Sequence, residues 1–240
     1  MSAFFAVTGV SKRFRGLVAV DRASFEVARG EIFAVIGPNG AGKTTLFNMI
    51  AGALKPDDGA IAFAGERIDG RRPDEICRRG IARTFQIVRP FPALTVEDNI
   101  MVGALLRTSS PAHARATAHD VMRQLDLFDK RGRIAKSLTL PDRKRLEVAR
   151  ALATAPQLLL LDEVMAGLRP TETDRIVAIL RELNAQGLTI LLIEHVMRAV
   201  MALANRVLVL HHGAPIALGS PADVVREPAV ISSYLGAEAI

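Results

Sequence analysis

A glycine-rich turn near the start of the chain carries residue types that can hold a polyanion. Residues 37–45 read Gly-Pro-Asn-Gly-Ala-Gly-Lys-Thr-Thr, fit the pattern G-x-x-x-x-G-K-[ST], and follow the apolar run 32–36. Glycines let backbone N–H groups point inward at phosphates, and a following helix adds its positive end. We expect Lys43 to contact the terminal phosphates and Thr44 to bind Mg²⁺. The predicted nucleotide-binding residues here are Gly37, Asn39, Gly40, Ala41, Gly42, Lys43, Thr44 and Thr45.

A second group of residues supplies carboxylates. The apolar run 158–161 ends abruptly in Asp162 and Glu163. We expect Asp162 to hold Mg²⁺ through its waters and Glu163 to polarise an attacking water as a general base. The alternative is a strand that simply ends in acidic surface residues. A phosphate loop alone does not distinguish GTPases, kinases, helicases and transporter motors from one another. The acidic strand end narrows the choice among these classes of protein.

The composition sets limits on the kind of protein. With 240 residues, half of them hydrophobic, the chain can bury a substantial α/β core. A single cysteine, Cys77, and an N-terminus without a secretion signal indicate a reducing, cytoplasmic setting. No apolar run approaches the ~18 residues of a membrane span, so we expect any membrane contact to go through a partner.

The net charge of +6 raises the question of nucleic acid binding. The chain has one tyrosine and no tryptophan, and no basic stripe is interleaved with aromatic residues. Its basic clusters lie near acidic residues; they include Arg71, Arg72, Arg78, Arg79 and Arg83. We therefore expect no nucleic acid partner.

The elements that must position these residues follow from hydrophobic patterning. Apolar runs on both faces at 158–161 and 188–193 are typical of parallel strands covered by helices. Between about 95 and 137 the apolar spacing becomes three and four residues, which predicts a helical segment. Further strands are predicted at 4–10, 23–27, 32–36, 60–63, 206–210 and 215–218, and helices at 45–53, 74–79, 172–183 and 222–235.

Three further features appear in register with the two nucleotide motifs. They are Gln86, His195 after a buried strand, and the segment 146–152, Leu-Glu-Val-Ala-Arg-Ala-Leu, before the acidic strand. Together these residues resemble an ABC-type ATPase subunit over essentially the whole chain. The resemblance implies an α/β P-loop NTPase core with a parallel sheet, an N-terminal antiparallel β subdomain and a helical subdomain. It implies one domain, 1–240, with its core at 1–92 and 156–240 and its helical subdomain at 93–155.

The same resemblance implies roles for single residues, with ATP and Mg²⁺ as cofactors. Phe14 would stack on adenine, although it could be an ordinary packing aromatic. Gln86 would sense Mg²⁺ and relay to a membrane subunit. His195 would contact the γ-phosphate and support Glu163. The catalytic set is therefore Glu163, His195 and Gln86, and the metal set is Thr44, Gln86 and Asp162.

Finer matches resemble the ATP-binding subunits of branched-chain amino-acid importers, a group that includes urea and amide importers. They are the segments 80–91, 44–50 and 233–236. The resemblance implies permease subunits and a second ATP-binding subunit, identical or different, as partners. A solute-binding protein would act only indirectly, and the chain would lie peripherally on the cytoplasmic face of the inner or plasma membrane. A soluble ABC-type protein of ribosomes or DNA repair and a non-hydrolysing regulator are the alternatives.

One segment departs from the family pattern. The family signature, Leu-Ser-Gly-Gly-Gln, caps the nucleotide held by the opposite subunit, but residues 138–142 read Leu-Thr-Leu-Pro-Asp. Pro141 removes an N–H donor, Asp142 adds a negative charge, and Thr139 with Asp142 forms a capping pattern. We therefore expect this signature segment to be impaired. The alternative is that the cations at 143–145 restore phosphate binding, while Val164 and Arg169 are smaller departures.

Overall fold

The computed structural model describes residues 3–85 and 89–235 and contains two sheets. One sheet is antiparallel, with the order β2-β1-β4-β5. Its strands are β1 (Phe5–Phe14), β2 (Leu17–Val27), β4 (Asp58–Phe63) and β5 (Glu66–Arg67). The other has the order β10-β9-β3-β8-β7-β6 and is parallel except for β10.

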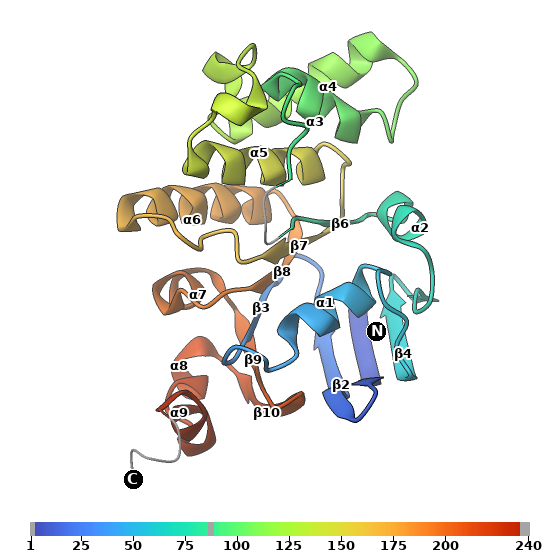
Figure 1. Ribbon diagram of the computed structural model, residues 1–240, viewed down its shortest axis with the longest axis vertical. Helices are drawn as coiled ribbons and strands as arrows, with labels where there is room; N and C mark the ends of the chain where they lie inside the picture. Colours follow the sequence, from blue (N-terminus) through green and yellow to red (C-terminus); the bar gives the residue numbers. More distant parts are fainter. Residues whose placement is uncertain (1–2, 86–88, 236–240) are drawn as a thin grey trace.

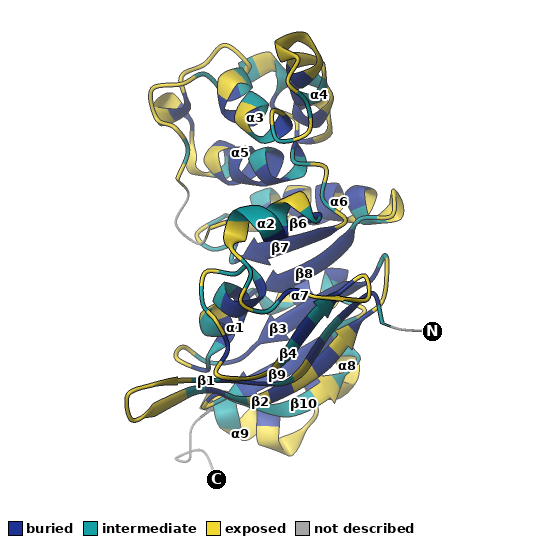
Figure 2. Ribbon diagram, turned by 90° about the vertical axis from the view of Figure 1, so that its right-hand side faces the viewer, coloured by how far each residue is buried: buried dark blue, intermediate teal, exposed yellow. Residues whose placement is uncertain are grey.

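The parallel sheet forms the centre of the molecule. It is built from β3 (Ile32–Ile36), β6 (Ile81–Arg83), β7 (Leu158–Asp162), β8 (Thr189–Ile193), β9 (Arg206–His211) and β10 (Ala214–Gly219). Every residue of β3, β7 and β8 is buried, which the dark blue central strands in Figure 2 make visible. Continuous apolar runs fit strands that are covered on both faces.

Helices cover this sheet on both sides, as Figure 1 shows. They are α1 (Lys43–Ile50), α2 (Pro73–Arg78), α6 (Pro170–Ala185), α7 (Met197–Leu203), α8 (Pro221–Val224) and α9 (Pro228–Leu235). Proline opens four of these six helices, where its missing N–H costs no intrahelical bond. No helix in the described part of the chain has both the length and the apolar character needed to cross a bilayer.

A group of helices forms the upper end of the molecule in Figure 1. It contains α3 (Val96–Ala104), α4 (Pro111–Gln124), α5 (Leu140–Leu152) and the short 3₁₀ turns Phe128–Lys130 and Ala135–Ser137. Their buried residues belong to the same hydrophobic cluster as one face of the parallel sheet. The core is therefore continuous, and the predicted division at 93 and 155 stays a prediction.

The expected fold class is confirmed, and the differences lie in element ends, one divided helix and two short strands. The first two strands run further than predicted and form a long hairpin. The predicted helix 222–235 is divided into α8 and α9, because Pro228 disfavours helical geometry in the residue before it. The strands β5 and β6 were not predicted, since runs of two and three residues carry no usable periodicity.

Candidate functional site

Two glycines of the phosphate loop stand where no side chain fits. A Cβ on Gly37 would lie 2.1 Å from the Leu210 carbonyl oxygen, and one on Gly42 would lie 2.2 Å from that of Ala19. Both residues have positive φ angles, 146° and 99°. Gly42 is the N-cap of α1, so the loop leads directly into the helix start. The glycines therefore let the loop close tightly at the positive end of α1.

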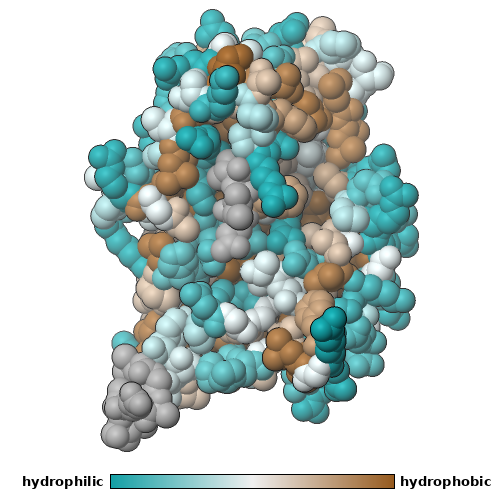
Figure 3. Space-filling view, viewed as in Figure 1, coloured by the Kyte–Doolittle hydropathy of each residue, from teal (hydrophilic) through white to brown (hydrophobic). Residues whose placement is uncertain are grey.

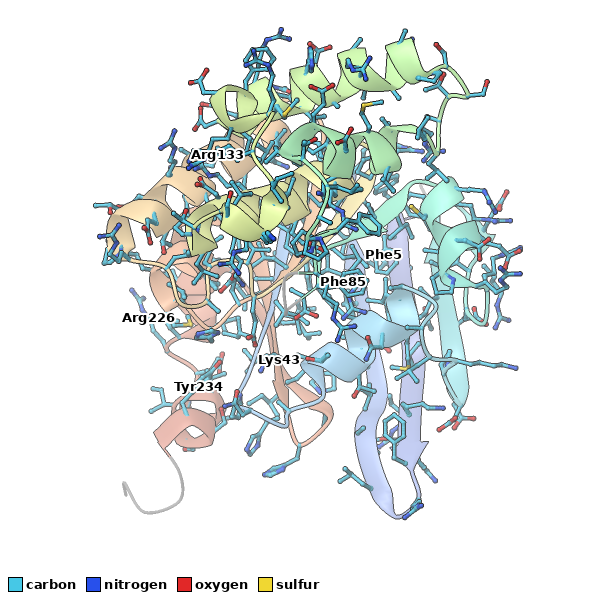
Figure 4. The ribbon with its side chains drawn as sticks, turned by 45° about the horizontal axis from the view of Figure 1, so that its top comes forward. Phe5, Lys43, Phe85, Arg133, Arg226 and Tyr234 are labelled. Atoms are coloured by element: carbon cyan, nitrogen blue, oxygen red, sulfur yellow. The ribbon has the colours of Figure 1, made fainter. Side chains whose placement is uncertain are left out.

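Lys43 lies inside the loop at the start of α1, where Figure 4 labels it. Its Nζ donates to the carbonyl oxygens of Gly37 at 2.6 Å and Pro38 at 3.0 Å. Burial lowers the pKa of the Lys43 ammonium, and the negative charges of Glu163 and Asp162 oppose that shift. The ammonium thus sits among acceptors that a phosphate oxygen can replace.

A cavity of about 470 Å³ joins the loop to the other predicted residues. This volume falls in the range of small-molecule and cofactor sites. Phe14, at the end of β1, and Glu163 line it together with Asn39, Gly40, Ala41, Gly42, Lys43, Thr44 and Thr45. The structure thus brings Phe14, the loop and Glu163 to one place. His212, which the sequence analysis did not single out, also lines this cavity.

Asp162 ends β7 beside the loop and is 1% exposed. Its Oδ2 forms an ion pair with Arg83 at 2.8 Å, and Arg83 also donates to Asn48 Oδ1 at 2.6 Å. Its buried Oδ1 has no hydrogen-bond partner within the described residues. A buried carboxylate oxygen left in this state fits a hydrated Mg²⁺. Arg83 was predicted only as part of a basic cluster, and its pairing with Asp162 was missed because β6 was not predicted.

Glu163 adopts an unusual backbone conformation, with a φ of +50°. Its N–H donates to the Ile193 carbonyl at 2.9 Å. Its own carbonyl accepts from Lys144 Nζ at 2.9 Å and from the Ala166 N–H at 3.2 Å. Left-handed geometry is disfavoured for a residue with a Cβ, so these contacts hold the peptide in place.

The histidine after β8 lies close to this carboxylate. His195 Nδ1 is 4.0 Å from Glu163 Oε2, beyond hydrogen-bond distance, and 55% of the His195 side chain is exposed. The structure therefore brings His195 beside Glu163 and leaves it accessible. Gln86, the third predicted catalytic residue, lies outside the described residues, so its placement stays a prediction.

Glu194, which the sequence analysis left out, is buried between His195 and β8. Its Oε1 accepts from the Met165 N–H at 2.9 Å, and its Oε2 has no partner among the residues described. Burial raises the pKa of the Glu194 carboxyl to about 7, and the charge of Glu163 adds to this shift. A carboxylate directly after the apolar run 190–193 was the signal that could have identified it.

The signature segment starts α5 and is held by its own side chains. Thr139 Oγ accepts from the Asp142 N–H at 3.4 Å and donates to Asp142 Oδ2 at 2.9 Å. Asp142 is buried and also forms ion pairs with Lys130 and Arg145. Burial would raise the pKa of Asp142, but hydrogen bonds from Lys130 and Thr139 lower it instead. The predicted cap is present.

These contacts change two expectations about the signature segment. Lys130 and Arg145 compensate the charge of Asp142 within the chain, which weakens the expected repulsion of a partner's phosphate. The neighbouring cations are engaged as well: Arg143 binds the Leu138 carbonyl, Lys144 that of Glu163, and Arg145 the Asp142 carboxylate. The alternative in which these cations restore phosphate binding therefore loses support. The missing N–H of Pro141 at the start of α5 is the departure that these contacts leave unchanged.

A second hollow lies between the sheet and the upper helices. This groove, of about 420 Å³, is bounded by residues of α2, β6, α3 and α5. Phe85 is 50% exposed and Val102 45% exposed along it, and Cys77 also lines it. Figure 3 shows hydrophobic residues beside the hydrophilic α2 on this face. Phe85, which lines the groove, directly precedes Gln86 in the chain.

Comparison with known sequences assigns the chain to a group. The family described as "ABC transporter" matches residues 20–166, and the family described as "Branched-chain amino acid ATP-binding cassette transporter" matches residues 214–240. The "High-affinity branched-chain amino acid transport ATP-binding protein LivG" of Escherichia coli (strain K12) is 40% identical, over 96% of this chain and 97% of LivG. The "Lipopolysaccharide export system ATP-binding protein LptB" of Acidithiobacillus ferridurans is 34% identical over 98% of both chains.

Solved structures agree with the sequence comparison. A nucleotide-free ATP-binding cassette from an ABC transporter superimposes with a TM-score of 0.90 at 31% identity, over 98% of this chain and 100% of that one. The same values describe an ATP-binding cassette of an ABC transporter in its ADP conformation. The chain belongs to the ABC transporter family and is an ABC-type ATPase.

Proposed function

We propose that this chain is the motor subunit of an importer for branched-chain amino acids. The single observation that carries the motor assignment is the cavity in which the phosphate loop, Phe14 and Glu163 meet. The solute assignment rests on the C-terminal family match and on the relatives named for branched-chain amino acid transport. LptB, at 34% identity, is named for lipopolysaccharide export, so the cassette alone does not define the cargo.

In this proposal the cavity holds ATP both at its adenine and at its phosphates. Phe14 stacks on adenine, and the backbone N–H groups of the loop hold the phosphates. Lys43 exchanges its contacts with the Gly37 and Pro38 carbonyls for the terminal phosphate oxygens. Thr44, Asp162 and Gln86 would hold Mg²⁺, which when bound neutralises phosphate charge. The unpartnered Asp162 Oδ1, considered within the described chain, supports this assignment.

Glu163 performs the proton step. Its carboxylate accepts a proton from the water that attacks the γ-phosphate, which makes that water a better nucleophile. The hydrogen bonds of the Glu163 main chain keep its carboxylate in the lining of the cavity. His195, whose Nδ1 lies 4.0 Å from Glu163 Oε2, contacts the γ-phosphate and supports Glu163.

Movement follows from pairing with a second ATP-binding subunit. In this proposal two subunits meet head to tail, and each signature segment covers the nucleotide held by the other. ATP binding closes the pair and hydrolysis reopens it. This chain gives its partner a signature in which Pro141 lacks an N–H and the N–H of Asp142 is already bound. A different partner with an intact signature then completes the better site.

The groove between α2, α3 and α5 is where we place the permease. Its walls come from the parallel sheet and from the upper helices, so a segment seated there contacts both parts. Exposed Phe85 and Val102 offer apolar contacts. Gln86 follows Phe85 in the chain, which puts the proposed Mg²⁺ sensor next to the proposed docking site.

Transport measurements test the assignment. The complex that copurifies with this chain from detergent-solubilised membranes is reconstituted into vesicles, and ATP-dependent uptake of leucine is measured. We expect uptake that is lost in Lys43→Ala and kept in the control Lys55→Ala, since Lys55 is exposed and away from the loop. Uptake of urea or an amide, and not of leucine, would change the solute that we assign to the importer. Copurification with ribosomes and no permease would contradict the transport role.

A further inference from the structure

A buried lysine of α5 remains unexplained by nucleotide binding. Lys144 is 5% exposed, and its only predicted role was the alternative in which the cations at 143–145 restore phosphate binding. Placing an ammonium group out of water is unfavourable unless it is hydrogen-bonded and compensated by negative charge. Its position therefore needs a reason beyond the surface charge of a helix.

The hydrogen bond of Lys144 leads to the catalytic carboxylate by way of the main chain. Its Nζ donates to the carbonyl oxygen of Glu163 at 2.9 Å, across 19 positions of sequence. The carbonyl belongs to the residue with the left-handed backbone, φ +50°. The peptide on the other side of Glu163 is fixed by its N–H bond to Ile193 on β8. The orientation of these two peptides sets the direction of the Glu163 side chain, which lines the cavity.

The place of Lys144 on α5 connects this contact to the signature segment. Lys144 lies on the first turns of α5, two residues after Asp142, and the same helix begins with the signature segment. A displacement of α5 by the opposite subunit's nucleotide thus moves the Nζ that holds the Glu163 peptide.

From this geometry, and building on the proposed function, we infer that Lys144 is a positioning residue that links the signature helix to Glu163 of the same subunit. The contact makes the catalytic carboxylate of one site sensitive to the nucleotide held by the other. Lys144 touches neither substrate nor the attacking water in this role. It acts through the carbonyl of Glu163.

A competing explanation is charge compensation. The carboxylates of Glu194, Glu163 and Asp162 all lie near the Lys144 ammonium, so the lysine could serve only to balance them. The two explanations differ in what a neutral hydrogen-bond donor can replace. A glutamine amide still donates to a carbonyl but carries no charge, whereas methionine matches the lysine stem and has no donor.

Steady-state kinetics of the copurified complex separate these explanations. We compare Lys144→Met, Lys144→Gln and the control Arg181→Met, because Arg181 also donates from a helix to a backbone carbonyl, that of Ala202. We expect Lys144→Met to lower kcat about tenfold or more with KM for ATP within about twofold. Lys144→Gln should keep more than half of the wild-type kcat, and Arg181→Met should match the wild type.

Several results would overturn the inference. They are an unchanged kcat in Lys144→Met, a KM that rises in step with the loss of kcat, or a loss in Lys144→Gln as large as in Lys144→Met. If Lys144→Met does not assemble, Lys144→Gln decides alone by the same criterion. The wild type and Glu163→Gln are measured alongside. Turnover that is absent in the wild type or intact in Glu163→Gln contradicts the proposed function itself.

Discussion

Several charged side chains cluster next to the nucleotide cavity. Arg83 neutralises Asp162, and Lys144 lies near Glu163 and Glu194. Glu194 has no ion pair within the described chain, whereas Asp162 has one, and the Oε2 of Glu194 has no hydrogen-bond partner there. Its carboxyl is therefore the group whose protonation should affect the stability of the fold most directly.

The pKa of Glu194 gives a pH-dependent stability with a definite sign. Burial and the charge of Glu163 raise this pKa from 4.5 to about 7, against the opposing backbone N–H groups of Met165 and His195 and the charge of Lys144. Between these values the folded state keeps a proton that the unfolded chain releases. Stability is therefore lost as the pH rises toward 7, by about 3 kcal/mol at most.

Replacement of Glu194 by glutamine removes the loss of stability that accompanies its ionisation. We expect Glu194→Gln to raise the thermal midpoint relative to the wild type more at pH 8 than at pH 5, because glutamine needs no proton to stay neutral. Calorimetry or fluorescence melting at the two pH values measures the difference. Glu227→Gln, at an exposed position, is the matched control. An equal gain at both pH values would count against the role of Glu194 as the titrating group.

Among the elements, α5 combines two substitutions that the structure separates. Pro141 occupies the second helical position and has no N–H to offer a phosphate. Asp142 occupies the third and organises Thr139, Lys130 and Arg145 around its carboxylate. The sequence alone presented both as the same kind of defect. In the structure Asp142 is a stabilising centre, whereas the effect of Pro141 on a partner's phosphate stays a prediction from its missing N–H.

The two substitutions should therefore respond in opposite ways. Pro141→Gly restores an N–H toward the partner's phosphate, and we expect ATP turnover of the complex to rise about tenfold, the effect of one hydrogen bond to a charged group. Asp142→Gln leaves two cations without their carboxylate and should destabilise the chain by about 3 kcal/mol. Turnover assays and denaturant unfolding measure these effects. No gain from Pro141→Gly would remove the claim of an impaired signature.

The elements also show what sequence patterns can and cannot predict. The buried strands β3, β7 and β8 were predictable because continuous apolar runs end in polar functional residues. The phosphate loop was predictable because Gly37 and Gly42 have no sterically allowed replacement. The contacts of Lys144 with Glu163 and of Arg83 with Asp162 were not, since they join residues that only the packed sheet brings together.

At the scale of the whole molecule, the proposed pairing gives the chain half of each of two sites. Its own cavity holds the phosphate loop, Phe14 and Glu163, while its α5 would present a signature to a second subunit. Lys144 connects these halves within one chain. This arrangement suits a motor, because the state of one nucleotide can reach the carboxylate that acts on the other.

The central claim is that this cavity hydrolyses ATP with Glu163 as the base. The most direct measurement compares ATP binding and turnover of the copurified complex in the wild type and in Glu163→Gln. The account predicts that Glu163→Gln binds ATP at least as tightly as the wild type and loses turnover at this site by a factor of about a hundred or more. Undiminished turnover of the variant with normal ATP binding would contradict it.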